Sequence, residues 1–141
     1  MNVESEVKAM TTIDTLMVEV AEMQILIPVL DIEYCFKDAE RVNKNNSYIS
    51  YKNSMVPVVS LREQFNYPPD THNDTMVIII NKYDKRYAVT TDHIIGEHQA
   101  EIKPLGDLFA NQSFFSGGSI MVDGKLALIL DTNFFYNQLK H

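Results

Sequence analysis

The chain has 141 residues, of which 45% are hydrophobic and 22% charged, and its formal net charge is −7. This length suits one domain or two very small ones, and the composition is that of an ordinary globular protein. The acidic balance disfavours non-specific nucleic-acid binding, which depends on Lys and Arg to displace counterions from phosphates. The single cysteine, Cys35, excludes an intrachain disulfide and a cysteine metal cluster.

The sequence pattern also disfavours membrane insertion and secretion. No apolar run approaches the ~20 residues that span a bilayer, and residues 1–8 lack the basic and then apolar layout of a secretory signal. We therefore expect a cytoplasmic protein whose partners are other proteins. Residues 1–12 are interpreted as a lead or a linker from a preceding domain, and residues 13–141 as the folded domain.

Alternating and apolar runs predict extended segments in the first half of the chain. These segments lie at residues 16–20, 23–29, 31–36, 48–51 and 55–59. Pro28 belongs at the end of its strand because proline removes a backbone donor. Good helix formers with apolar ends predict one helical turn over residues 61–65. The prolines and polar residues of 67–74 predict a linker.

The second half of the chain shows the same kinds of segment in the same order. Extended segments are predicted at residues 76–80, 86–89, 99–102, 119–122 and 126–130. The pair Asp123-Gly124 predicts a type I′ turn between the last two, because both central residues of that turn need a positive φ. Residues 126–130 are apolar throughout, which is typical of a strand covered on both faces. A helical turn over 131–135 follows, with Asp131 as its N-cap.

The two halves can be aligned as an internal repeat. Leu16 corresponds to Met76, Ile25 to Arg86 after one inserted residue at the turn over 82–85, and Asp31 to Asp92. Further on, residues 58–60 correspond to 129–131. Each half is near the lower size limit for a self-sufficient core, so we expect the two to share one apolar seam. The prediction is an all-β fold of two packed five-stranded, mostly antiparallel barrels, intertwined and divided near residues 66–75.

No arrangement of residues predicts catalysis or a bound cofactor. His93 and His98, with Glu97 and Glu101 nearby, could form a metal site, but no helix is predicted that would bring the two imidazoles together. Neither a phosphate-binding glycine loop nor a nucleophile elbow is present. The repeated aspartates are interpreted as turn caps or acceptors of backbone hydrogen bonds rather than as paired catalytic acids.

Apolar side chains in loops and hairpins are the candidate partner contacts. Phe114 and Phe115 are adjacent, so they cannot both face one core. We assign Phe115 to the core and Phe114 to a partner surface. In the hairpin over 48–59, Tyr51 and Met55 are the other candidates, and the core positions are Ile49, Val56 and Val58.

An ordered set of short motifs over about residues 12–138 resembles the CheW-like domain family. The motifs are residues 18–20, 27–28, 56–62, 103–106 and 116–131. The Ser-Gly, Asp-Gly and Ala-Leu-Ile-Leu-Asp combination within 116–131 is closer to the C-terminal regulatory domain of the chemotaxis histidine kinase CheA than to free CheW. The sequence departs from the family pattern at Val122, where a glycine is usual, and at Ser60, where an aspartate is frequent.

The resemblance implies a non-catalytic domain of two SH3-like barrels. Such a domain would couple a chemotaxis kinase to the adaptor CheW and to the cytoplasmic tips of chemoreceptors, through contact between barrels. A free-standing CheW adaptor is the alternative with the same fold and partners. A small enzyme or ligand-binding barrel with a cleft between its modules is the alternative from another class.

Overall fold

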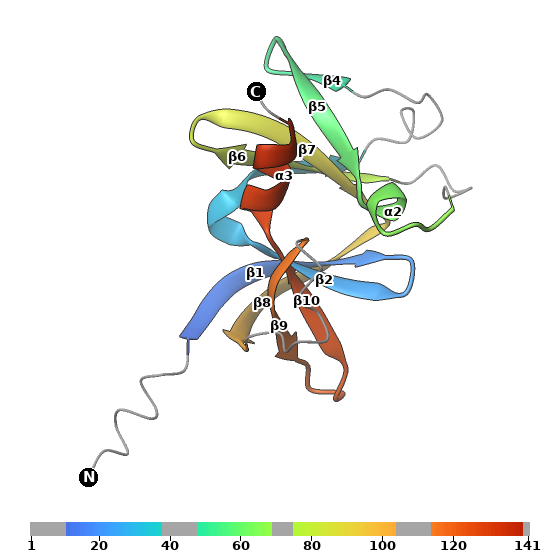
Figure 1. Cartoon of the computed structure of the whole chain (residues 1–141), viewed down its shortest axis with the longest axis vertical. Coiled ribbons are helices and arrows are strands. Elements are labelled where there is room, and N and C mark those ends of the chain that lie inside the picture. The colour runs from blue at the N-terminus through green and yellow to red at the C-terminus, as the bar shows by residue number, and fades with distance from the viewer. Residues whose placement is uncertain (1–10, 38–47, 69–74, 104–113, 140–141) are drawn as a thin grey trace.

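The computed structural model describes residues 11–37, 48–68, 75–103 and 114–139, which form two five-stranded sheets (Figure 1). Sheet A has the strand order β8-β1-β2-β10-β9, and sheet B has the order β3-β6-β7-β5-β4. The elements are β1 (Thr11–Val20), β2 (Met23–Pro28), η1 (Val29–Asp31), β3 (Ile32–Lys37), β4 (Tyr48–Tyr51), β5 (Ser54–Ser60), α2 (Leu61–Gln64), β6 (Met76–Lys82), β7 (Lys85–Thr91), β8 (His93–Ile102), β9 (Phe115–Ile120), β10 (Leu126–Leu130) and α3 (Thr132–Leu139).

Each sheet is built from both halves of the chain. Sheet A takes β1 and β2 from the first half and β8, β9 and β10 from the second, while sheet B takes the complementary strands. Replacing every strand of sheet A by its counterpart in the repeat gives the order of sheet B, which confirms the internal repeat. Among the strand pairs of the described residues, only β2–β10 and β5–β7 are parallel, so the prediction of a mostly antiparallel all-β fold is also confirmed.

The alignment of the repeated hairpins needs a correction. Val20 pairs with Met23 and Lys82 pairs with Lys85, so both hairpins have two-residue turns and no residue is inserted. Ile25 therefore corresponds to Tyr87, not to Arg86, and Leu16 corresponds to Ile78, not to Met76. The burial agrees, because Ile25, Tyr87 and Ile78 all lie in the same apolar core.

Three apolar clusters account for the long apolar runs. The largest lies between the sheets and includes Val18, Val20, Ile25 and Ile27 from sheet A and Ile78, Ile80, Tyr87 and Val89 from sheet B. A second cluster lies on the other face of sheet A around Leu26 and Ile129, and a third on the other face of sheet B around Ile79 and Ala88. Central strands are thus covered on both faces, as predicted for β10 apart from its exposed first residue, Leu126.

The turn at Asp123-Gly124 differs from the predicted type I′ turn. Gly124 has a φ of +85°, but Asp123 is not among the residues with positive φ. The Gly124 N–H donates to the Met121 carbonyl and the Met121 N–H donates to the Lys125 carbonyl, so the loop has three residues, with glycine in the left-handed position. Two-residue turns with positive φ at both positions occur instead at Lys52-Asn53 and Tyr83-Asp84.

Both helices begin at side-chain caps. The Ser60 hydroxyl accepts from the Glu63 N–H, and Asp131 Oδ1 accepts from the N–H groups of Asn133 and Phe134, as predicted for Asp131. Helix α3 and strands β1 and β8 are longer than predicted. Residues 38–47, 69–74 and 104–113, which include most of the predicted linker, lie outside the described residues. No helix in the described part of the chain has the length and apolar character needed to cross a membrane.

Candidate interaction surfaces

The described residues do not assemble a metal-binding cluster. Within ranges 11–37, 48–68, 75–103 and 114–139, no group of three or more His, Cys, Asp or Glu side chains is placed to hold a metal ion. His93 is exposed at the start of β8, and His98 lies half-buried in the same strand. Several apolar side chains reach solvent, and the surfaces that carry them are the candidate sites.

The first of these surfaces is the β4–β5 hairpin at one end of the molecule (Figure 1). Ile49 and Val56 are buried inside it and Val58 packs beside them, as predicted. Met55 stands on the opposite face of the hairpin with 66% of its side chain exposed, and Tyr48 is also exposed. The alternation of a β-strand explains this arrangement, because successive side chains point to opposite faces.

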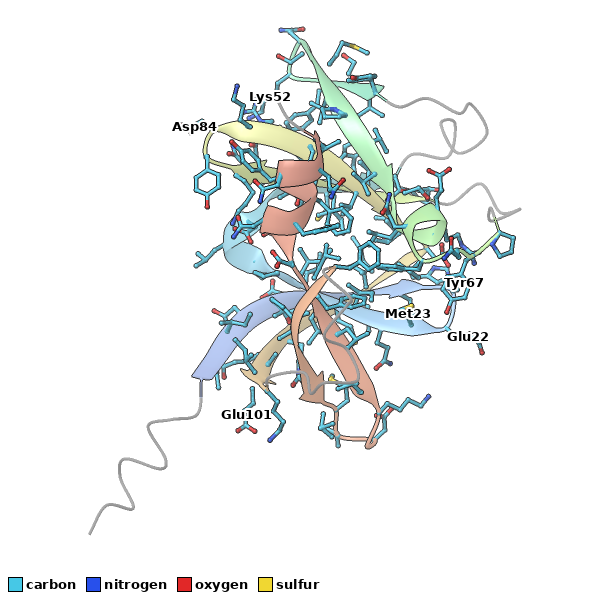
Figure 2. The ribbon with its side chains drawn as sticks, viewed as in Figure 1. Glu22, Met23, Lys52, Tyr67, Asp84 and Glu101 are labelled. Atoms are coloured by element: carbon cyan, nitrogen blue, oxygen red, sulfur yellow. The ribbon has the colours of Figure 1, made fainter. Side chains whose placement is uncertain are left out.

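Tyr51 belongs to a polar and aromatic network rather than to the exposed face. Its hydroxyl donates to Glu33 Oε2 over 3.0 Å, its ring lies 6.2 Å from that of Tyr34, and the Arg86 guanidinium sits 5.5 Å from its centroid. Tyr51 is half-buried, so a partner could reach only part of its ring. In the view of Figure 2, Lys52, the next residue, is drawn near Asp84 of the β6–β7 turn.

Glu33 is the centre of that network. It lies at an irregularity in β3 and accepts from Arg86 Nε at 2.8 Å, Asn81 Nδ2 at 2.9 Å and Tyr51, with Lys52 Nζ 3.4 Å away. The hydrogen bonds from Arg86 and Asn81 lower the pKa of Glu33 to about 2. The carboxylate thus joins β3 to β4, β6 and β7. Since β3 and β4 are the two edge strands of sheet B, its hydrogen bond to Tyr51 connects the edges of the sheet through side chains.

The second surface is the β9–β10 hairpin, the counterpart of the first in the repeat. Since residues 58–60 correspond to 129–131, Leu126 takes the place of Met55, and 41% of Leu126 is exposed. Its cross-strand neighbour Ile120 and the loop residue Val122 are also exposed. Sequence reasoning missed these three residues, although the alignment of Met55 with Leu126 contained a signal for one of them.

Phe114 lies in a group of five phenylalanines that joins both helices. Its ring is 5.5 Å from Phe65 after α2 and 5.3 Å from Phe134 in α3, with Phe115 and Phe135 close by. Phe115 is buried, as predicted. Phe114 is half-buried and packs against the core between the sheets, so its partner-binding role stays a prediction.

A family model for the CheW-like domain matches residues 14–139. The chain belongs to this family. It is 32% identical over 130 residues to the chemotaxis protein CheA of Bacillus subtilis, and the alignment covers 88% of this chain and 19% of that protein. It is 27% identical over 132 residues to CheA of Listeria innocua, covering 89% of this chain and 21% of the relative. The chain therefore spans about a fifth of the length of these relatives.

Among solved structures, the fold is similar to the scaffolding protein TtCheW from Thermoanaerobacter tengcongensis. The TM-score is 0.72 and the identity 16%, and the superposition covers 86% of this chain and 90% of that chain. Both comparisons agree with the predicted CheW-like fold. The relatives in sequence are chemotaxis proteins.

Proposed function

We propose that this domain is the non-catalytic regulatory module of a chemotaxis histidine kinase and that it couples the kinase to CheW and to chemoreceptor tips in the cytoplasm. The match to CheA over most of the chain supports the kinase assignment. The observation that carries the interaction role is the pair of equivalent hairpins, β4–β5 and β9–β10, each with an apolar side chain in solvent at the same position of the repeat.

The proposed mechanism is contact between barrels through these hairpins. Met55 on one hairpin and Leu126 on the other both expose a large part of their surface to solvent. Burying such side chains against a partner is favourable at roughly 25 cal/mol per Å² of apolar surface. Because TtCheW has the same fold, a CheW partner would offer an equivalent hairpin against which either side chain could pack. Tyr51 and Phe114, which are half-buried, would contribute at the margins of such contacts.

A free-standing CheW adaptor is the second candidate. The observation in its favour is the structural similarity to TtCheW, which extends over nearly the whole of both chains. The two candidates share their fold and partners, and they differ in whether the native gene continues upstream into a kinase. Reading the gene upstream of Met1 distinguishes them.

The test of the interaction role is binding to the CheW of the same organism and to a receptor cytoplasmic tip. We expect saturable binding of CheW by the purified domain and weaker binding by Met55→Asp or Leu126→Asp. Loss of an apolar anchor at the centre of an interface costs about 2 kcal/mol, which is roughly thirtyfold in Kd. Ile95→Asp is the matched control, since Ile95 is similarly exposed but lies on β8, outside both hairpins.

Binding that both hairpin variants retain would contradict the proposed contact. If a well-folded domain binds neither CheW nor the receptor tip, the interaction role itself is wrong. A small ligand between the barrels would then be the function to seek.

A further inference from the structure

Asp31 and Asp92 lie at the two points where the chain crosses from one sheet to the other. Asp31 ends η1, which joins β2 of sheet A to β3 of sheet B. Asp92 lies between β7 of sheet B and β8 of sheet A. The two crossings run in opposite directions, so the aspartates occupy reciprocal places in the fold.

Each carboxylate binds the hairpin of the sheet that the chain is entering. Asp31 Oδ1 is 3.1 Å from Nζ of Lys82, at the end of β6 in sheet B. Asp92 Oδ2 accepts from the Ala21 N–H over 2.7 Å, in the β1–β2 turn of sheet A. The backbone contact of Asp92 was predicted from the sequence, whereas Asp31 binds side chains instead.

Each carboxylate also binds a helix that arrives from the opposite sheet. Helix α3 follows β10 of sheet A, and the Thr132 hydroxyl at its start donates to Asp31 Oδ2 over 2.8 Å. Helix α2 follows β5 of sheet B, and Arg62 Nε donates to Asp92 at 2.9 and 3.2 Å. Figure 1 shows α3 rising from β10 onto sheet B.

We infer that Asp31 and Asp92 form reciprocal latches, each tying a crossover, a hairpin and a helix together, and that the two latches set the orientation of sheet A relative to sheet B. The apolar core between the sheets provides most of the attraction between them, but hydrophobic burial itself is not directional. Charge-assisted hydrogen bonds have defined lengths and angles. These bonds are largely shielded from solvent, since no more than about a fifth of any of the four ion-paired side chains is exposed.

Other contacts support the same two attachments. The Tyr87 hydroxyl on β7 donates to the Thr132 carbonyl over 2.7 Å, which holds the start of α3 on sheet B, and burial raises the pKa of Tyr87. The Arg62 guanidinium also donates through Nη1 to the Pro68 carbonyl over 2.6 Å, so its latch extends to the segment after α2. Each helix is thus fixed at its arrival point by more than one bond.

The experiment measures residual dipolar couplings of the backbone amides in the weakly aligned domain. In the wild type, both sheets should fit one alignment tensor. In Asp31→Asn/Asp92→Asn, we expect the two sheets to need separate tensors, because the charged acceptors are lost. Asp14→Asn, an acid-to-amide change on the exposed face of β1, should keep the wild-type fit.

A single wild-type tensor in the folded double variant would overturn the inference. If that variant does not fold, Thr132→Val and Arg62→Gln decide the matter, because each removes the helix donor of one latch. Separate tensors in either of these variants support the latches, and a wild-type fit in both overturns them.

Discussion

At the scale of the residue, Glu33 controls more contacts than its place in the sequence suggests. It receives donors from three other strands of sheet B, and its pKa is about 2. None of this was predictable, because the donors lie 18 to 53 positions away and a half-buried glutamate in a strand gives no local signal. In sheet A, the segments of the edge strands β8 and β9 are joined differently, by a backbone bridge between Lys103 and Gly118.

Replacing Glu33 by Gln should lower the free energy of unfolding by about 1 kcal/mol at neutral pH, since hydrogen bonds to a charged acceptor are lost and part of the group is screened by solvent. The folded-state pKa lies below the usual 4.5, so the carboxylate stabilises the fold above that pH. This contribution should disappear as the pH falls from 4.5 towards 2. Urea unfolding at several pH values measures it. Glu22→Gln, at an exposed turn, is the control, and equal effects of both variants at neutral pH would refute the role of Glu33.

At the scale of the element, most strands and both helices could be predicted from apolar patterning, proline and capping residues. The lengths of the turns could not be predicted from the sequence, and turn length decides the register in which the two strands of a hairpin pair. One supposed inserted residue misaligned Ile25 with Arg86, and the Asp-Gly pair gave a three-residue loop instead of a type I′ turn. The residues that do adopt the two-residue turn, Tyr83-Asp84 among them, carry weaker turn preferences and are held by the strands on either side.

Helix α3 is stabilised at its start by the N-cap residue Asp131. Asp131→Ala removes the acceptor for the N–H groups of Asn133 and Phe134, and the domain should lose about 1 kcal/mol of stability. Thermal unfolding compared with Asn137→Ala, an exposed change later in the same helix, isolates the cap. An unaltered melting temperature together with lost CheW binding would show that Asp131 contacts a partner and is not a cap.

At the scale of the whole molecule, the exchange of strands between the sheets explains why this fold was only partly predictable. The repeat and the shared apolar core followed from patterning, because alternation reports which residues are buried. Patterning does not report which sheet a strand joins. Only the structure shows that β1 and β2 belong to the same sheet as β8, β9 and β10. The same holds for the surfaces. Met55 was predicted to be available to a partner, whereas Ile120 and Val122 lie in an apolar run that was interpreted as a strand, and their exposure was not predicted.

The proposed function requires that the domain binds CheW through one or both of its equivalent hairpins. Backbone amide shifts of the labelled domain, recorded while unlabelled CheW is added, test it most directly. We expect saturable shifts concentrated on the β4–β5 hairpin, the β9–β10 hairpin or both, with the outer edge around Ile95 unchanged. Shifts confined to other surfaces, or none at saturating CheW, would contradict it.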